Sequence, residues 1–133
     1  MIEWDNKYSV DISIIDEEHK QLIGIINKAI AAKQLSNNSK EIIEILNEIN
    51  NYALTHFADE EAYMIQFNYP DYEQHRKEHQ GFSIETMAFF DSVAKGDCQL
   101  ASKILEHLKS WLVHHVQGTD RKYIDCFTEN GLK

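Results

Sequence analysis

The sequence predicts an all-α protein: an up-down-up-down antiparallel four-helix bundle with an extended N-terminal arm and a short C-terminal helix. One proline and five glycines among 133 residues indicate few turns and long helices. Apolar residues recur at steps of three and four along four successive segments, which is the spacing of helices that bury one face. Four such helices joined by short loops most simply form this bundle.

Length and composition favour one domain without nucleic-acid or membrane partners. A chain of 133 residues is near the commonest domain size, and we divide it into an arm (1–15), a bundle (16–118) and a C-terminal segment (119–133). The net charge of −9 argues against nucleic acid or an anionic membrane as a partner. The N-terminus lacks the features of a secretory signal, and no apolar run could span a bilayer. We expect a cytoplasmic protein, and we favour buried free thiols at Cys98 and Cys126 over a disulfide between them.

The arm alternates apolar and polar residues, with Val10, Ile12 and Ile14 as its apolar members. This alternation is strand-like, but no second strand follows that could pair with it. We therefore expect the arm to lie along the helices, with Trp4 and Tyr8 as its anchors.

The first two helices each carry polar residues within their apolar face. Asp16 is a suitable N-cap for the first helix, whose apolar face includes His19. Ser39, at the end of a polar loop, is a suitable N-cap for the second. His56 and Glu60 lie in the middle of that second apolar face.

The third and fourth helices show the same feature. Pro70 suits the first position of the third helix, whose apolar face includes His75 and His79. The pair Gly96-Asp97 ends that helix. The fourth apolar face includes His115, and a short C-terminal piece then covers one end of the bundle.

Polar residues on all four apolar faces indicate a metal site. His56 with Glu60, and His75 with His79, are pairs four residues apart, so each pair lies on one face of its helix. Burying a carboxylate and several imidazoles without partners would cost about 2 kcal/mol or more for each group. A shared metal ion removes that cost and explains why every helix carries the same polar interruption.

Two other classes of site fit less well. Residues 75–79 match the H-x-x-E-H pattern of one class of zinc peptidases, with Glu78 as general base. The chain offers no sheet or second domain for a peptide substrate, however, and Glu78 lies off the apolar face, where we expect it to be solvated. A ferritin-like site needs Glu-x-x-His pairs, and no histidine here has a glutamate three residues before it.

The remaining histidines have less specific interpretations. His114 and His115 point about 100° apart on a helix, so only one of them can face the core. We assign that role to His115, which shares its face with Trp111, and expect His114 to be peripheral. His107 flanks the same face and is expected to be half-buried or at the surface.

These residues resemble the hemerythrin family. The motifs that carry the resemblance are H-F-x-x-E-E-x-x-M at 56–64, Y-P at 69–70, H-x-x-x-H at 75–79, W-L-x-x-H-x-x-x-x-D-x-x-Y at 111–123 and D-x-x-H at 16–19. They span essentially the whole chain, which is similar in length to the single-domain bacterial members.

The resemblance implies a non-heme di-iron centre, with two iron ions and a bridging hydroxide or oxide. It implies seven protein ligands: His75, His79 and His115 at one iron, His19 and His56 at the other, and Glu60 and Asp120 bridging the pair. Spacing alone does not predict Asp120, because a five-residue step turns about 140° away from His115. Gly118 lies between the two, so we hypothesise a π-type bulge at this point.

The ligand count favours an O2 carrier. Two irons with about six ligands each offer roughly twelve positions. Five imidazoles, two bridging carboxylates and the bridging hydroxide fill roughly eleven of these, which leaves about one for a small diatomic molecule. The resemblance implies that O2 binds at the iron held by His19 and His56. Candidate walls of the O2 pocket, which core packing alone would also explain, are Ile23, Phe57, Trp111 and Leu112.

We therefore expect a non-enzymatic protein that binds O2 reversibly for storage, delivery or scavenging. We expect a monomer, and an unidentified protein acceptor of the O2 is left open. Three alternatives remain: a sensor of O2, redox state or nitric oxide; a di-iron enzyme acting on peroxide or nitric oxide; and a structural bundle with adventitious metal.

Overall fold

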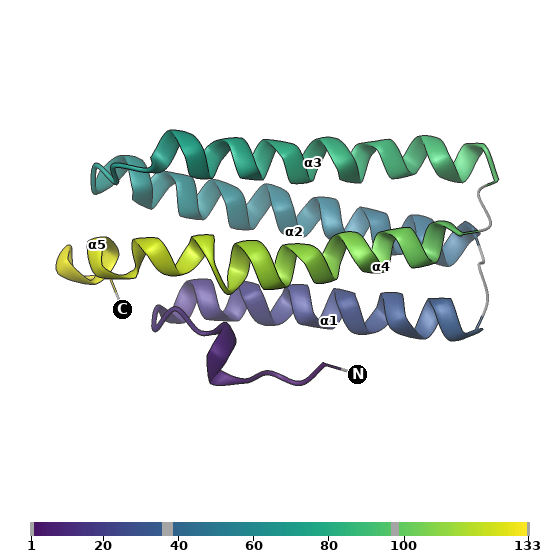
Figure 1. The fold of residues 1–133 in the computed structure, drawn as a ribbon, viewed down its shortest axis with the longest axis horizontal. Helices are drawn as coiled ribbons and strands as arrows, with labels where there is room; N and C mark the ends of the chain where they lie inside the picture. The colour runs from purple at the N-terminus through teal and green to yellow at the C-terminus, as the bar shows by residue number, and fades with distance from the viewer. Residues whose placement is uncertain (1, 36–38, 97–98, 133) are drawn as a thin grey trace.

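The computed structural model shows four long helices packed side by side, with a shorter helix beyond one end of the bundle (Figure 1). It describes residues 2–35, 39–96 and 99–132. The long helices are α1 (Ser13–Leu35), α2 (Ser39–Gln66), α3 (Tyr72–Ala94) and α4 (Leu100–Trp111). Successive helices run in opposite directions, and the described residues contain no strand, which confirms the predicted all-α bundle.

The region after α4 is built from short pieces. A π-helical segment, η2, covers Leu112–Val116, and a 3-10 segment, η3, covers Thr119–Tyr123. The short helix α5 (Ile124–Glu129) follows and extends past the end of the bundle. The π-helical segment lies where the sequence analysis placed a helix distortion, so that hypothesis is confirmed.

The N-terminal arm lies along α1, as predicted (Figure 1). Asn27 of α1 both donates to and accepts from the backbone of Ile2, at 2.9 and 2.8 Å. Tyr8 is buried in the core, while Trp4 is half-buried and packs against it. A short 3-10 turn, η1 (Asn6–Tyr8), replaces part of the extended conformation that we expected.

The predicted start of α1 is wrong, because α1 begins at Ser13 and not after Asp16. The carboxylate of Asp16 instead accepts hydrogen bonds from the Ser9 hydroxyl (2.6 Å) and from the Val10 backbone N–H (2.8 Å). These bonds fasten the arm to the first turns of α1. Asp11 makes the sharp turn between the arm and α1, with a φ of 57°.

The predicted start of α3 is also displaced. Pro70 is not at the first helical position: it lies in the exposed turn before α3, which begins at Tyr72 with Asp71 as its N-cap. Asn68 adopts a φ of 54° as the chain leaves α2, and the buried Tyr69 follows it. The chain therefore needs two more residues to turn than the proline signal indicated.

The other helix ends agree with the sequence where they can be compared. The helix α2 begins at Ser39 itself, within one residue of the predicted start. Gly96 follows α3 with a φ of 70°, a left-handed conformation that favours glycine. The polar loop before Ser39 falls largely on 36–38, and Asp97 and Cys98 on 97–98, outside the described residues. Cys126 is a free thiol, half-buried and not fully buried as expected.

The apolar core has two parts with the polar residues between them. The larger cluster fills the end of the bundle where α2 and α4 begin and reaches as far as Phe57 of α2. The smaller cluster begins at Met64 of α2 and includes residues of the arm and of α5. Glu60 lies between these two α2 residues, just as His19 lies between Ile15 and Leu22 on α1. The fold thus brings the polar residues of every helix to one level of the bundle.

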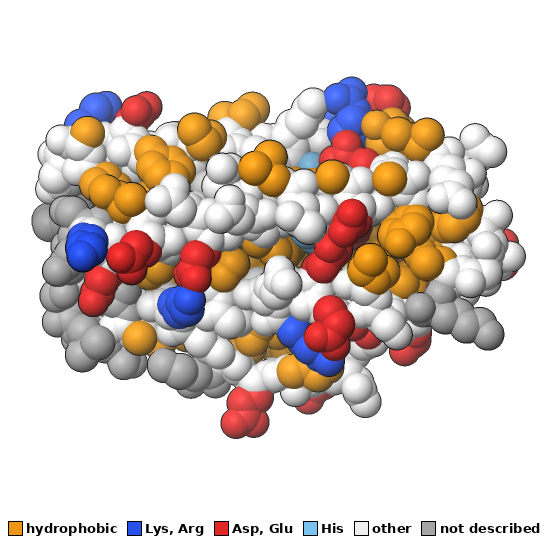
Figure 2. Space-filling view, turned by 180° about the vertical axis from the view of Figure 1, so that it is seen from behind, with side chains coloured by type: hydrophobic (Ala, Val, Ile, Leu, Met, Phe, Trp, Pro, Cys, Tyr) orange, Lys and Arg blue, Asp and Glu red, His pale blue; other side chains and the backbone are white. Residues whose placement is uncertain are grey.

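No described helix combines the length and the apolar character needed to span a membrane. Figure 2 shows acidic, basic and apolar side chains intermixed over one face of the bundle, with only traces of histidine visible. Five of the seven histidines are buried: His19, His56, His75, His79 and His115.

Candidate metal centre

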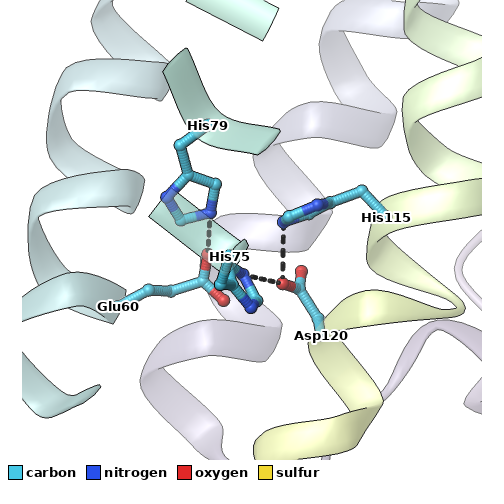
Figure 3. Close-up of side chains that lie close together, drawn as sticks. All are labelled: Glu60, His75, His79, His115 and Asp120. Atoms are coloured by element: carbon cyan, nitrogen blue, oxygen red, sulfur yellow. Dashed lines mark ion pairs between the residues drawn. The ribbon is translucent and has the colours of Figure 1, made fainter. Parts of the chain in front are cut away.

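Seven polar residues converge at the level between the two apolar clusters. They come from all four sides of the bundle and are 2% exposed or less: His19 from α1, His56 and Glu60 from α2, His75 and His79 from α3, His115 from η2 and Asp120 from η3. Figure 3 shows five of them pointing toward one another. These are the seven residues that the sequence analysis put forward, and the structure brings all of them together.

The π-helical segment brings Asp120 to His115. The backbone N–H of Gln117 donates to the carbonyl oxygen of Leu112, five residues earlier, and the chain then tightens into η3. Gly118 at this junction is required by space, because a Cβ atom there would lie 2.6 Å from the backbone oxygen of His114. The result is a distance of 2.9 Å between Asp120 Oδ1 and His115 Nε2.

The seven side chains form two overlapping donor groups of unequal size. In each group, one possible ligand atom from every member lies within 4.8 Å of the others. The larger group has five donors: Glu60, His75, His79, His115 and Asp120. The smaller has four: His19, His56, Glu60 and Asp120. Both carboxylates belong to both groups, which is the arrangement that two bridged cations need.

The inward-facing atoms have no hydrogen-bond partner among the described residues. The Nε2 atoms of all five histidines, Glu60 Oε1 and both oxygens of Asp120 are buried and unpaired in this sense. Several of them nevertheless approach closely: Asp120 lies 3.0 Å from His19 Nε2 and 2.9 Å from His75 Nε2. Possible ligand atoms that converge without hydrogen-bond geometry fit a shared cation, because buried polar atoms otherwise find partners. The residues present therefore fit a metal pair.

Three carboxylates hold the histidines from outside. Glu18 lies 2.8 Å from His56 Nδ1, and the corresponding distances are 2.8 Å for Glu61 with His79 and 3.0 Å for Glu78 with His115. A carboxylate on one ring nitrogen fixes the orientation of the imidazole and directs the other nitrogen inward.

The expectation that Glu78 is solvated is wrong. Its side chain is 33% exposed, and Thr119 Oγ1 donates to it at 2.9 Å while it also contacts His115. Being off the apolar face did not place Glu78 in solvent, because its carboxylate contacts His115 of η2 and Thr119 of η3. Glu18 and Glu61 also orient histidines, a role that the sequence did not predict.

Tyr123 belongs to the last hemerythrin-like motif and to the C-terminal segment, but the sequence predicted no role for it; in the structure it reaches the site. It is fully buried, and its hydroxyl donates to Glu60 Oε2. Burial, followed by the charges of Glu60 and Asp120, raises the pKa of Tyr123 well above its ordinary value, so the hydroxyl keeps its proton. Tyr123 thereby holds one oxygen of Glu60 in place.

In the metal-free site, the pKa values of two histidines are strongly raised. Burial alone lowers the pKa of His56, but Glu60 and Glu18 outweigh it and raise the pKa to about 10. Burial also lowers the pKa of His115. Asp120 and Glu78 outweigh that effect and raise the pKa to about 9. The metal-free site therefore stores protons on these imidazoles, and a cation has to displace them.

Glu60 and Asp120 shift in the opposite direction. Burial raises the pKa of each carboxyl, but the surrounding histidines outweigh it, so both pKa values end well below the ordinary range. Both carboxyls are therefore ionised at neutral pH and available to cations.

Two aromatic residues of the predicted O2 pocket cover the imidazoles. Phe57 stacks on His79 with a centroid distance of 3.9 Å, and Trp111 stacks on His115 at 3.7 Å. The other two predicted wall residues are buried in the same apolar cluster: Ile23 and Leu112. Their role toward O2 stays a prediction.

The remaining histidines agree with the sequence. His114 is exposed whereas His115 is buried, so the choice between the two neighbours holds. His107 is half-buried, pairs with Glu85 at 2.8 Å and lies outside both donor groups.

Comparisons with known proteins point to one family. The family model of the hemerythrin HHE cation binding domain matches residues 10–127. The chain is 27% identical to a bacteriohemerythrin of Stenotrophomonas maltophilia, over 94% of this chain and 80% of that protein. It is also 27% identical to a bacteriohemerythrin of Clostridium acetobutylicum (94% and 100% covered) and 30% identical to a myohemerythrin of Theromyzon tessulatum (91% and 89% covered). The chain belongs to the hemerythrin family.

Proposed function

We propose that the protein binds O2 reversibly at a di-iron centre, for oxygen storage, delivery or scavenging. Membership of the hemerythrin family implies the di-iron centre, and the seven converging side chains are the donors that it would use. We assign three residues to one iron, two to the other and two to both: His75, His79 and His115; His19 and His56; Glu60 and Asp120.

The observation that carries the proposal is the unequal size of the two donor groups. One group offers five donors and the other four, with Glu60 and Asp120 common to both. With a bridging hydroxide or oxide added, a metal ion that prefers about six ligands is complete in the first group and has about one position left in the second. An iron pair with one such position can supply electrons to O2 and recover them when O2 leaves. The small number of positions favours a carrier over an enzyme.

The protein's own residues supply the surroundings that a reversible carrier needs. Phe57 and Leu112 are buried, and Trp111 packs against Phe57 with a centroid distance of 5.5 Å. This apolar wall excludes water from the site. The outer carboxylates keep the histidines oriented, and the Tyr123 hydroxyl keeps Glu60 oriented, so the donors need little rearrangement on binding.

The test is an absorption spectrum recorded with an iron assay through one cycle of reduction and exposure to O2. We expect about two irons per chain, a nearly colourless reduced protein, and a colour with O2 that disappears when O2 is removed. Zinc in place of iron, or a colour that never reverses, contradicts the proposal. Sustained consumption of peroxide or nitric oxide would instead support the di-iron enzyme.

A further inference from the structure

Two hydrogen-bond donors beside the proposed centre have no role in the O2 binding proposed for it. The hydroxyl of Tyr52 and the indole N–H of Trp111 are buried and face each other, yet neither makes a hydrogen bond of good geometry with a described residue. The Tyr52 side chain is 4% exposed. Buried donors are nearly always paired, so two unpaired donors at one place require an explanation.

Tyr52 lies at the four-donor end of the site, whereas the ring of Trp111 stacks on His115 of the five-donor group. Tyr52 precedes His56 by one turn of α2, and its ring stacks on the His56 imidazole with centroids 5.1 Å apart. The edge of Tyr52 also contacts Phe57, which in turn packs on Trp111. Tyr52 thus lies next to the iron position that we propose has room for a ligand, and Trp111 adjoins it through Phe57.

The two groups cannot fully satisfy each other. An indole can only donate, so a contact between them would use the oxygen of Tyr52 and leave its proton free. No described side chain accepts that proton. The acceptor that completes this pair therefore has to come from outside the chain.

We propose that Tyr52 and Trp111 donate hydrogen bonds to a small anionic ligand bound at the four-donor position, and that Tyr52 favours ligands with negative charge on their outer atom. This inference rests on the proposed function, because the ligand is held at the same iron. It adds a polar selection device to a pocket that otherwise has apolar walls.

The test measures azide, a small linear anion, by visible titration of the oxidised di-iron protein. Tyr52→Phe removes only the hydroxyl, and we expect it to raise the azide Kd by about tenfold, as for a lost hydrogen bond to a charged group. Trp111→Phe is expected to raise the Kd as well. The matched control is Tyr63→Phe, on the same helix but beside Phe127 in the end cluster, which should leave the Kd unchanged.

A second measurement uses the metal-free protein. If the Tyr52 hydroxyl has no partner within the chain, Tyr52→Phe should unfold at the same temperature as the parent protein or at a higher one. A clear fall in that temperature means that the hydroxyl is paired inside the protein, and it overturns the inference.

The outcomes separate the two proposals. Equal azide binding by the parent protein and by Tyr52→Phe overturns this inference alone. An iron-loaded parent protein that binds no azide also overturns this inference alone, whereas a parent protein that lacks iron overturns the proposed function and this inference with it.

Discussion

The imidazole of His115 illustrates how one residue is prepared for a cation. Its Nε2 faces Asp120 at 2.9 Å without a hydrogen bond, and its Nδ1 lies 3.0 Å from Glu78. The hydrogen bond with His115 lowers the pKa of Glu78 despite partial burial, so the glutamate is ionised at neutral pH. An ionised partner holds the Nδ1 proton and leaves the Nε2 lone pair directed at the metal position.

Glu78→Gln should weaken metal binding without removing a donor. The amide keeps the shape of the side chain but no longer carries the charge that favours this tautomer of His115. We expect the affinity for iron to fall by about 10- to 100-fold, measured by competition with a chelator. Glu73→Gln, on the same helix in an exposed pair with Arg76, is the control and should change little. Equal losses in both variants would mean that general charge, and not orientation, is responsible.

The residue scale also shows what helical spacing can and cannot predict. Spacing placed His56 with Glu60, and the apolar faces placed His19 and His115, because a regular helix fixes where each side chain points. The outer carboxylates were missed because they belong to the sides of the helices. A usable signal exists: Glu18, Glu61 and Glu78 each directly adjoin a residue of the cluster, and such a neighbour points about 100° away, toward another helix.

At the scale of elements, the segment after α4 decides the geometry of the site. A regular helix would turn Asp120 about 140° away from His115. The π-helical turn over Leu112–Val116 and the 3-10 turn after it correct that angle. Sequence spacing could not predict this, because it assumes a uniform helix; the resemblance supplied Asp120, and Gly118 was the only local sign of the change.

Gly118→Ala tests that junction. The added Cβ would lie 2.6 Å from the backbone oxygen of His114, so the backbone has to move. We expect the metal-free protein to lose about 1–3 kcal/mol of its free energy of unfolding, measured with urea, and the iron content to fall as Asp120 is displaced. Gly24→Ala is the matched control: nothing lies within 4 Å of its Cβ, and alanine in a helix interior should stabilise by about 0.5–1 kcal/mol. A neutral Gly118→Ala would show that the junction can adapt.

The helix starts show a different limit of sequence reading. The apolar faces of all four helices were predictable because they depend on many residues each. The starts of α1 and α3 were not, since each depends on the use of one or two side chains. Asp16 looked like a cap but holds the arm, and Pro70 looked like a first helical residue but lies in the preceding turn.

At the scale of the whole molecule, the metal-free bundle keeps four groups charged in its interior. The pKa of His56 is raised to about 10 and that of His115 to about 9, so the stabilisation they give is complete below their unfolded values near 6.5 and is lost as pH rises through about 9–10. The lowered pKa values of Glu60 and Asp120 also stabilise the fold, but this stabilisation is present at neutral pH and is lost in acid. The metal-free fold is therefore most stable between the acidic range, where the carboxylates become protonated, and the alkaline range, where the histidines lose their protons.

Bound iron should reverse the fall in stability with rising pH in the alkaline range. Metal binding releases the protons held by the imidazoles, so its affinity rises with pH. We expect the difference in unfolding temperature between the iron-loaded and metal-free proteins to widen between pH 6 and pH 9. Iron uptake in a weakly buffered solution should also release protons that an indicator dye detects. A temperature difference that does not change with pH would mean that the histidines are already neutral in the metal-free protein.

The outer carboxylates connect neighbouring helices in order. Glu18 of α1 holds a histidine of α2, Glu61 of α2 holds one of α3, and Glu78 of α3 holds one beyond α4. A chimaera that takes one helix from a distant relative could keep every proposed ligand and still orient its neighbour's histidine wrongly. Evolution and protein engineering should therefore find this centre easier to exchange as adjacent helix pairs than as single helices or as a set of ligand residues.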